Sequence, residues 1–161
     1  MNLSALEEWV LDALLRRVRL LAVEQIEKLC RFRTFQQSPQ QAVRKLKRTG
    51  LVESFNLDCI VLDLQSPLAV WNASEKPHFD FSKIAWRAKS RFLKSEVRTQ
   101  QILLATKTAE NLFGGVGGSL RQPNQIMHDL GTAAVYVARK HQDSERNSPW
   151  IGEDVLRRSW R

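Results

Sequence analysis

The chain has 161 residues, of which 43% are hydrophobic, and its 25 Lys and Arg residues outnumber 17 Asp and Glu residues to give a net charge of +8 and a pI of about 10.0. This length fits one ordinary domain or two small ones, and the hydrophobic content excludes wholesale disorder. The basic balance favours a polyanionic partner, of which nucleic acid is the commonest.

Cysteine content and the N-terminus bear on the compartment. With only Cys30 and Cys59, neither in a C-x-x-C pair, a disulfide scaffold is excluded and reduced thiols are expected. We see no signal peptide and no transmembrane span. The basic clusters are not tied to a strongly apolar amphipathic face, which disfavours a membrane surface. We therefore predict a cytoplasmic protein with no membrane partner.

The first two predicted helices have clear signals. Ser4-x-x-Glu7 is a capping box that begins a helix whose face is so apolar that a second protomer could cover part of it, so a homodimer is possible. Helix 22–30 follows, with Val23, Ile26 and Leu29 inward.

A third helix is predicted over residues 38–50. Ser38 and Gln41 form a second capping box, Pro39 suits the first turn, and Gly50 ends the helix. The residues at i, i+3, i+4 and i+7 opposite the apolar stripe suit a DNA groove, where Arg pairs with guanine, Gln pairs with adenine and Lys meets phosphate. The alternative is a solvated basic helix. The predicted DNA-facing residues are Gln41, Arg44, Lys45 and Arg48, with Gln40 and Lys47 at the flanks and Ser38 on phosphate.

Strands are predicted directly after the third helix. The segments 51–57, 59–64 and 68–71 have strand composition, and a turn is expected over 56–58. Three helices followed by a β-hairpin predict a winged helix-turn-helix domain over residues 1–73, with Asn56 in the wing touching phosphate or the minor groove.

A basic linker and helix are predicted over residues 74–98. Within it, segment 81–94 contains five Lys and Arg residues and no acid. Arg87 and Arg91 are therefore candidates for phosphate contacts, although a charge run of this kind is more often a solvated face.

Residues 99–161 are predicted to form a smaller α/β extension. Segment 101–105 has the composition of a buried strand and Thr106 can cap a helix over 107–113, with one continuous helix over 100–113 as a rival. Gly114–Gly118 lacks a phosphate-loop motif and predicts a flexible connector. A further helix is expected over 123–140, and 150–154 is expected to be a strand or the entry to a short helix.

Several short motifs are spread along the chain: Gly50-Leu51-Val52, Ala105-Thr106, Asn111-Leu112-Phe113-Gly114-Gly115, His128-Asp129-Leu130 and Trp150-Ile151-Gly152-Glu153. Together they resemble the plasmid replication–relaxation family of bacterial proteins. In that family a winged helix precedes a nuclease-like region, which implies a DNA-binding role in plasmid or mobile-element replication, relaxation or transcriptional regulation. The nuclease motif of Pro-Asp followed by Glu-x-Lys does not occur after Glu153, so residues 99–161 would be only the start of that region.

Catalysis is not assigned. His128, Asp129 and Glu153, with Asp154, are the only candidate acid–base or metal set, and a local role at a helix start explains them as well. No cofactor, metal or small-molecule ligand is indicated. The sequence predicts an α+β, mostly helical protein that binds double-stranded DNA sequence-specifically. The alternatives are a metal-dependent nuclease or relaxase accessory, and a winged-helix module that binds proteins.

Overall fold

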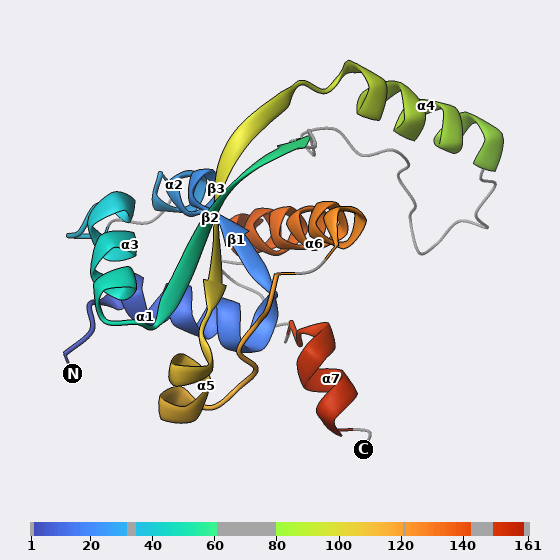
Figure 1. The fold of residues 1–161 in the computed structure, drawn as a ribbon. Coiled ribbons are helices and arrows are strands. Elements are labelled where there is room, and N and C mark those ends of the chain that lie inside the picture. Colours follow the sequence, from blue (N-terminus) through green and yellow to red (C-terminus); the bar gives the residue numbers. More distant parts are fainter. Residues whose placement is uncertain (1, 32–34, 61–79, 121, 143–149, 160–161) are drawn as a thin grey trace.

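The protein is an α+β structure in a computed structural model that describes residues 2–31, 35–60, 80–120, 122–142 and 150–159. Helices cluster around one three-stranded sheet, two of whose strands continue into a long ribbon (Figure 1). The elements are α1 (Ala5–Asp12), the π-helical turn η1 (Ala13–Arg17), β1 (Leu20–Ala22), α2 (Val23–Cys30), α3 (Pro39–Arg48), β2 (Val52–Ile60), α4 (Phe81–Lys94), β3 (Val97–Ala105), α5 (Lys107–Phe113), α6 (Pro123–Gln142) and α7 (Glu153–Ser159).

The sheet is antiparallel with the order β1-β3-β2. The pairs Leu20↔Leu104 and Val52↔Ala105 lie at its base, and the β2–β3 ribbon continues to Ile60↔Val97. Because β3 pairs with both other strands, the predicted division near residue 98 falls at the start of a strand that completes the N-terminal sheet. Helix α4 lies at the far end of the ribbon (Figure 1).

The predicted turn at residues 56–58 is wrong, because β2 runs without interruption from Val52 to Ile60. Phe55, Leu57 and Cys59 alternate onto one face and pack together, and this period of two outweighs the turn preference of the intervening Asn56 and Asp58. Of the predicted strand 59–64 only the start is described, and the predicted strand 68–71 lies outside the described residues.

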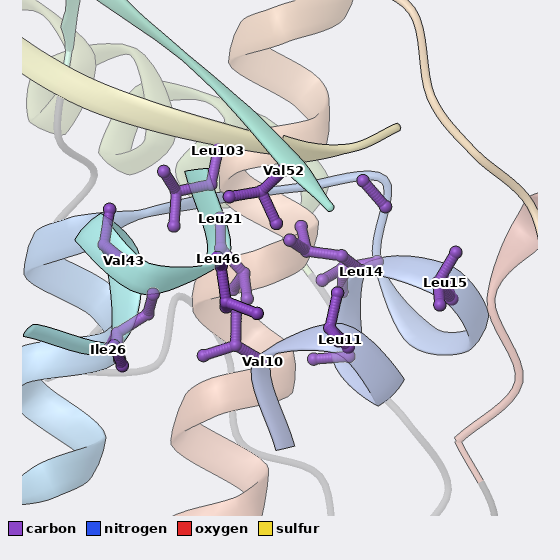
Figure 2. Packing of buried hydrophobic residues seen from close by; sticks show 14 of the residues in the cluster. Val10, Leu11, Leu14, Leu15, Leu21, Ile26, Val43, Leu46, Val52 and Leu103 are labelled. Carbon is purple, nitrogen blue, oxygen red and sulfur yellow. The ribbon is translucent and has the colours of Figure 1, made fainter. Parts of the chain in front are cut away.

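Both faces of the sheet base are covered. Leu21 and Leu103 point into the core formed with α1, η1, α2 and α3, shown in Figure 2. Their neighbours Leu20, Ile102 and Leu104 pack on the other face against α6. Burial on both faces explains why residues 102–105 are a continuous apolar run, and it confirms a strand rather than one helix over 100–113.

Helix α1 with η1 contributes its apolar side chains to the core of its own chain. Leu6, Val10, Leu11, Leu14 and Leu15 are each at most 3% exposed. The surplus of apolar residues that motivated a homodimer is therefore used within one protomer.

The local helix signals are confirmed. Capping boxes at Ser4–Glu7 and Ser38–Gln41 begin α1 and α3, and Thr106 caps α5. Gly50 follows α3 with a φ of +70°, the left-handed conformation expected for a helix-ending glycine.

The glycine-rich segment 114–118 does more than connect, because it closes the end of η1. The last carbonyls of a helix have no partner within the helix. Here Val116 N–H donates to Leu15 O at 2.8 Å and Gly152 N–H donates to Arg16 O at 3.0 Å. Two segments distant in sequence therefore satisfy the same helix end.

Gly115→Ala should destabilise the fold more than Gly50→Ala. Both glycines have positive φ, +88° and +70°, so both substitutions incur backbone strain of about 1–3 kcal/mol. A Cβ at Gly115 would also lie 2.5 Å from Leu15 O, whereas nothing lies within 4 Å of one at Gly50. We expect Gly115→Ala to cost about 1–3 kcal/mol more in urea unfolding. Equal losses would contradict this packing.

Candidate nucleic-acid interface

Helix α3 presents a polar and basic face to solvent. Ala42, Val43 and Leu46 are at most 4% exposed and attach the helix to the core through α1, α2 and β2. The side chains on its exterior are those of Gln40, Gln41, Arg44, Lys47 and Arg48, all of which are exposed.

Three cations on this face are available for a ligand. Among the described residues, Arg44, Lys47 and Arg48 have no acidic side chain within ion-pair distance. They therefore supply positive charge that the described part of the fold does not neutralise.

Lys45 is placed differently from the helical-wheel prediction. Its Nζ lies 2.8 Å from Oε2 of Glu7, a carboxylate with 0% side-chain exposure, and it also donates to Asn2 O at 3.0 Å. Glu7 further accepts from Ser4 N–H at 2.8 Å and from the Gln37 amide at 2.9 Å. Lys45 thus ties α3 to the start of α1 instead of facing outward with Arg44 and Arg48.

The groups around Glu7 lower the pKa of its carboxyl group. Burial alone would raise its pKa, but hydrogen bonds from Lys45, Ser4 and Gln37 together with the charge of Lys45 outweigh burial and hold the pKa below 4.5. The carboxylate is therefore ionised at neutral pH and positions α3.

The remaining polar residues of α3 are partly engaged. Ser38 Oγ accepts from Gln41 N–H at 3.3 Å, and the Gln41 side-chain oxygen accepts from Ser38 N–H at 3.4 Å. The Gln40 amide donates to Glu27 on α2. The hydrogen bond from Ser38 N–H to the Gln41 side chain is weak at 3.4 Å. The Gln41 amide can therefore give up this bond at little cost and pair with the edge of a DNA base.

The other predicted DNA contacts lie away from α3. Asn56 is exposed in the ribbon, opposite Gln101, and not in a turn. Arg87 and Arg91 are on α4, at the end of the ribbon opposite to α3 (Figure 1). The structure therefore groups Ser38, Gln40, Gln41, Arg44, Lys47 and Arg48 on α3 and at its N-cap. It separates Asn56, Arg87 and Arg91 from them.

The structure brings three of the four candidate catalytic residues together: Asp129, Glu153 and Asp154 line one pocket at the end of η1, where each carboxylate forms an ion pair, and His128 is not part of its lining. Asp129 Oδ2 lies 3.0 Å from Arg19 Nη1, and Asp154 Oδ1 lies 2.5 Å from Arg19 Nη2. Glu153 pairs with Arg157 at 2.5 Å, and His128 is exposed. Among the described residues, no group of three or more His, Cys, Asp or Glu is placed to hold a metal ion.

Arg19 was not among the predicted site residues. Its side chain is 8% exposed and joins the end of η1 to α6 through Asp129 and to α7 through Asp154. Burial would lower its pKa, but the hydrogen bonds and charges of both carboxylates raise the pKa above its ordinary value. No local motif marks this role, because the partners are 110 and 135 residues away in sequence.

The fold and this surface together define an α+β protein with a basic helix exposed beside a small antiparallel sheet. None of the helices in the described segments is long and apolar enough to cross a membrane. No family model, curated protein or solved structure matches the chain.

Proposed function

We propose that the protein binds double-stranded DNA sequence-specifically, with α3 in the major groove. The exposed set Gln41, Arg44 and Arg48 carries the proposal. Arg donates two hydrogen bonds to guanine and Gln pairs with adenine, so a face of this composition suits direct base recognition. Lys47 beside it suits phosphate.

The order of elements supports this proposal. The chain has a helix, a short strand, two helices and two further strands separated by α4, with the last strand pairing between the first two. This order supports a winged helix, which we propose as the DNA-binding domain. In such a domain α2 and α3 are the helix-turn-helix and the β2–β3 ribbon is the wing. Here the wing would be long and would carry α4 at its tip.

The biological setting follows from the resemblance to the plasmid replication–relaxation family. We propose that DNA binding by this protein serves plasmid or mobile-element replication, relaxation or their transcriptional regulation in a bacterial cytoplasm. The proposal assigns no catalysis, because the carboxylates Asp129 and Asp154 are occupied by Arg19.

Arg44→Ala combined with Arg48→Ala should weaken binding to a short duplex by at least tenfold. Each bidentate Arg–guanine pair is worth about 1–3 kcal/mol, and each lost phosphate neutralisation also lowers affinity. Fluorescence anisotropy of a labelled duplex pool at low salt measures the dissociation constant. A plot of the logarithm of the dissociation constant against the logarithm of the salt concentration should also have a smaller slope for the double variant.

A matched control removes the same charge elsewhere. Lys107→Ala combined with Arg157→Ala deletes two cations whose side chains are 71% and 61% exposed on α5 and α7. This variant should bind nearly as tightly as the unaltered protein. Equal losses in both variants would reduce the interaction to net charge, and failure of the unaltered chain to bind any duplex would favour a protein-binding module.

A further inference from the structure

Helix α4 is exposed to solvent along its length. None of its residues is buried. Large apolar side chains nevertheless occur along it, including Trp86 at 69% exposed and Leu93 at 72%. Exposed aromatic and aliphatic side chains of this size on one helix indicate an interaction surface.

Trp86 and Leu93 are surrounded by lysines. The two are seven residues apart, so they lie along one line of the helix. Lys83 and Lys89 are each three residues from Trp86, and Lys94 follows Leu93 directly. All three lysines are exposed. The face therefore combines one flat aromatic ring with three mobile positive charges.

Charge excludes a second copy of the same helix as the partner. The segment 81–94 contains five Lys and Arg residues and no Asp or Glu. Two such helices side by side would repel each other. The partner of this face must instead be an anion that also accepts an aromatic ring.

The position of Lys89 disfavours an anionic lipid surface. At about 100° per residue, Lys89 falls between Phe92 on one side and Leu93 with Trp86 on the other. If the side of the helix that carries Phe92, Leu93 and Trp86 entered the acyl region of a bilayer, the Lys89 ammonium group would lie among these apolar side chains. An interfacial helix keeps its cations on the polar face instead.

We infer that α4 binds single-stranded nucleic acid, with Trp86 stacking on an unpaired base and Lys83, Lys89 and Lys94 neutralising the adjacent phosphates. Stacking on an aromatic ring needs an open base face, which a single strand offers and a duplex hides. The inference does not rest on duplex binding by α3, because the two helices lie at opposite ends of the ribbon (Figure 1).

The test titrates a fluorescein-labelled oligothymidylate of 15 nucleotides with the full chain. Trp86→Ala should weaken binding by about 5- to 150-fold, the range measured for loss of one stacked base. Trp86→Phe should restore most of the affinity, because a ring remains. Replacing Lys83, Lys89 and Lys94 by Ala should lower the slope of log affinity against log salt by about 2.

Three results would overturn the inference. They are equal affinity of Trp86→Ala and the unaltered chain, no binding of the oligonucleotide at low salt, and binding to phosphatidylglycerol-containing vesicles that depends on Trp86 while the oligonucleotide is ignored. Because Trp86 is mostly exposed, its substitution should leave the thermal unfolding midpoint unchanged. The Arg44→Ala, Arg48→Ala variant should keep oligonucleotide binding while it loses duplex binding, so the two proposals can fail separately.

Discussion

Arg19→Met is expected to lower the free energy of unfolding by about 3–5 kcal/mol. The substitution removes a guanidinium that is 8% exposed and leaves Asp129, itself 7% exposed, as a buried carboxylate without a countercharge. It also removes the ion pair with Asp154, one of the links between the end of η1 and α7. Methionine retains much of the side-chain volume, so the loss reports charge and hydrogen bonds more than a cavity. Urea unfolding followed by circular dichroism measures it.

Arg157→Met is the matched control. Arg157 forms an i,i+4 pair with Glu153, but both side chains are more than half exposed. A surface pair of this kind contributes about 0–1 kcal/mol. If Arg19→Met and Arg157→Met lower the free energy of unfolding equally, the ion pairs of Arg19 with Asp129 and Asp154 do not hold α6 and α7 in place. Partial recovery of stability by adding Asp129→Asn to Arg19→Met would identify the stranded charge as the cause.

Lys45→Met is expected to cost about 3 kcal/mol at neutral pH, because it leaves the buried Glu7 carboxylate without its cation. The Gln37 amide and the Ser4 N–H remain, so the loss should stay below the upper end of the range for a buried pair. Replacing Lys47, which is exposed on the same helix, by Met should change stability by less than about 0.5 kcal/mol.

The effect of Lys45→Met should depend on pH in one direction. The pKa of Glu7 in the folded protein is depressed, so its pairing stabilises the fold above the unfolded pKa of about 4.5 and is lost as the pH falls through the depressed value. The difference in stability between Lys45→Met and the unaltered chain should therefore be constant above about pH 6 and shrink below pH 4.5. A difference that grows on acidification would contradict the assignment.

Local rules were sufficient for α1, α3 and α5. Ser4, Ser38 and Thr106 each cap the helix that follows them, and Gly50 ends α3 with positive φ, because capping depends on neighbours within four residues. The buried stripe of Ala42, Val43 and Leu46 follows from the helical period alone. The exposed positions of Gln41, Arg44 and Arg48 follow from the same pattern.

Features that depend on distant residues were not predictable in this way. Lys45 leaves the exposed set only because Glu7 is buried beneath it, 38 residues earlier in the chain. The strand Leu20–Ala22 is three residues long and follows a helix without a turn signal, and it exists because β3 pairs with it. The role of Arg19 likewise needs the positions of α6 and α7.

The ribbon shows how two signals compete. Asn56 and Asp58 favour a turn, whereas Phe55, Leu57 and Cys59 favour one continuous strand with a buried face. Strand β3, which begins at Val97, favours the continuous strand because it pairs with β2 along its whole length. The wing-like ribbon is thus formed by strands separated by α4 and not by adjacent segments.

Selection of duplexes from a random pool tests most directly whether α3 recognises DNA sequence. The unaltered chain should enrich a common motif that contains guanine, and the Arg44→Ala, Arg48→Ala variant should lose enrichment at the guanine positions while Lys107→Ala, Arg157→Ala keeps the motif. Enrichment of no motif by the unaltered chain, or of the same motif by both double variants, would contradict sequence recognition by α3.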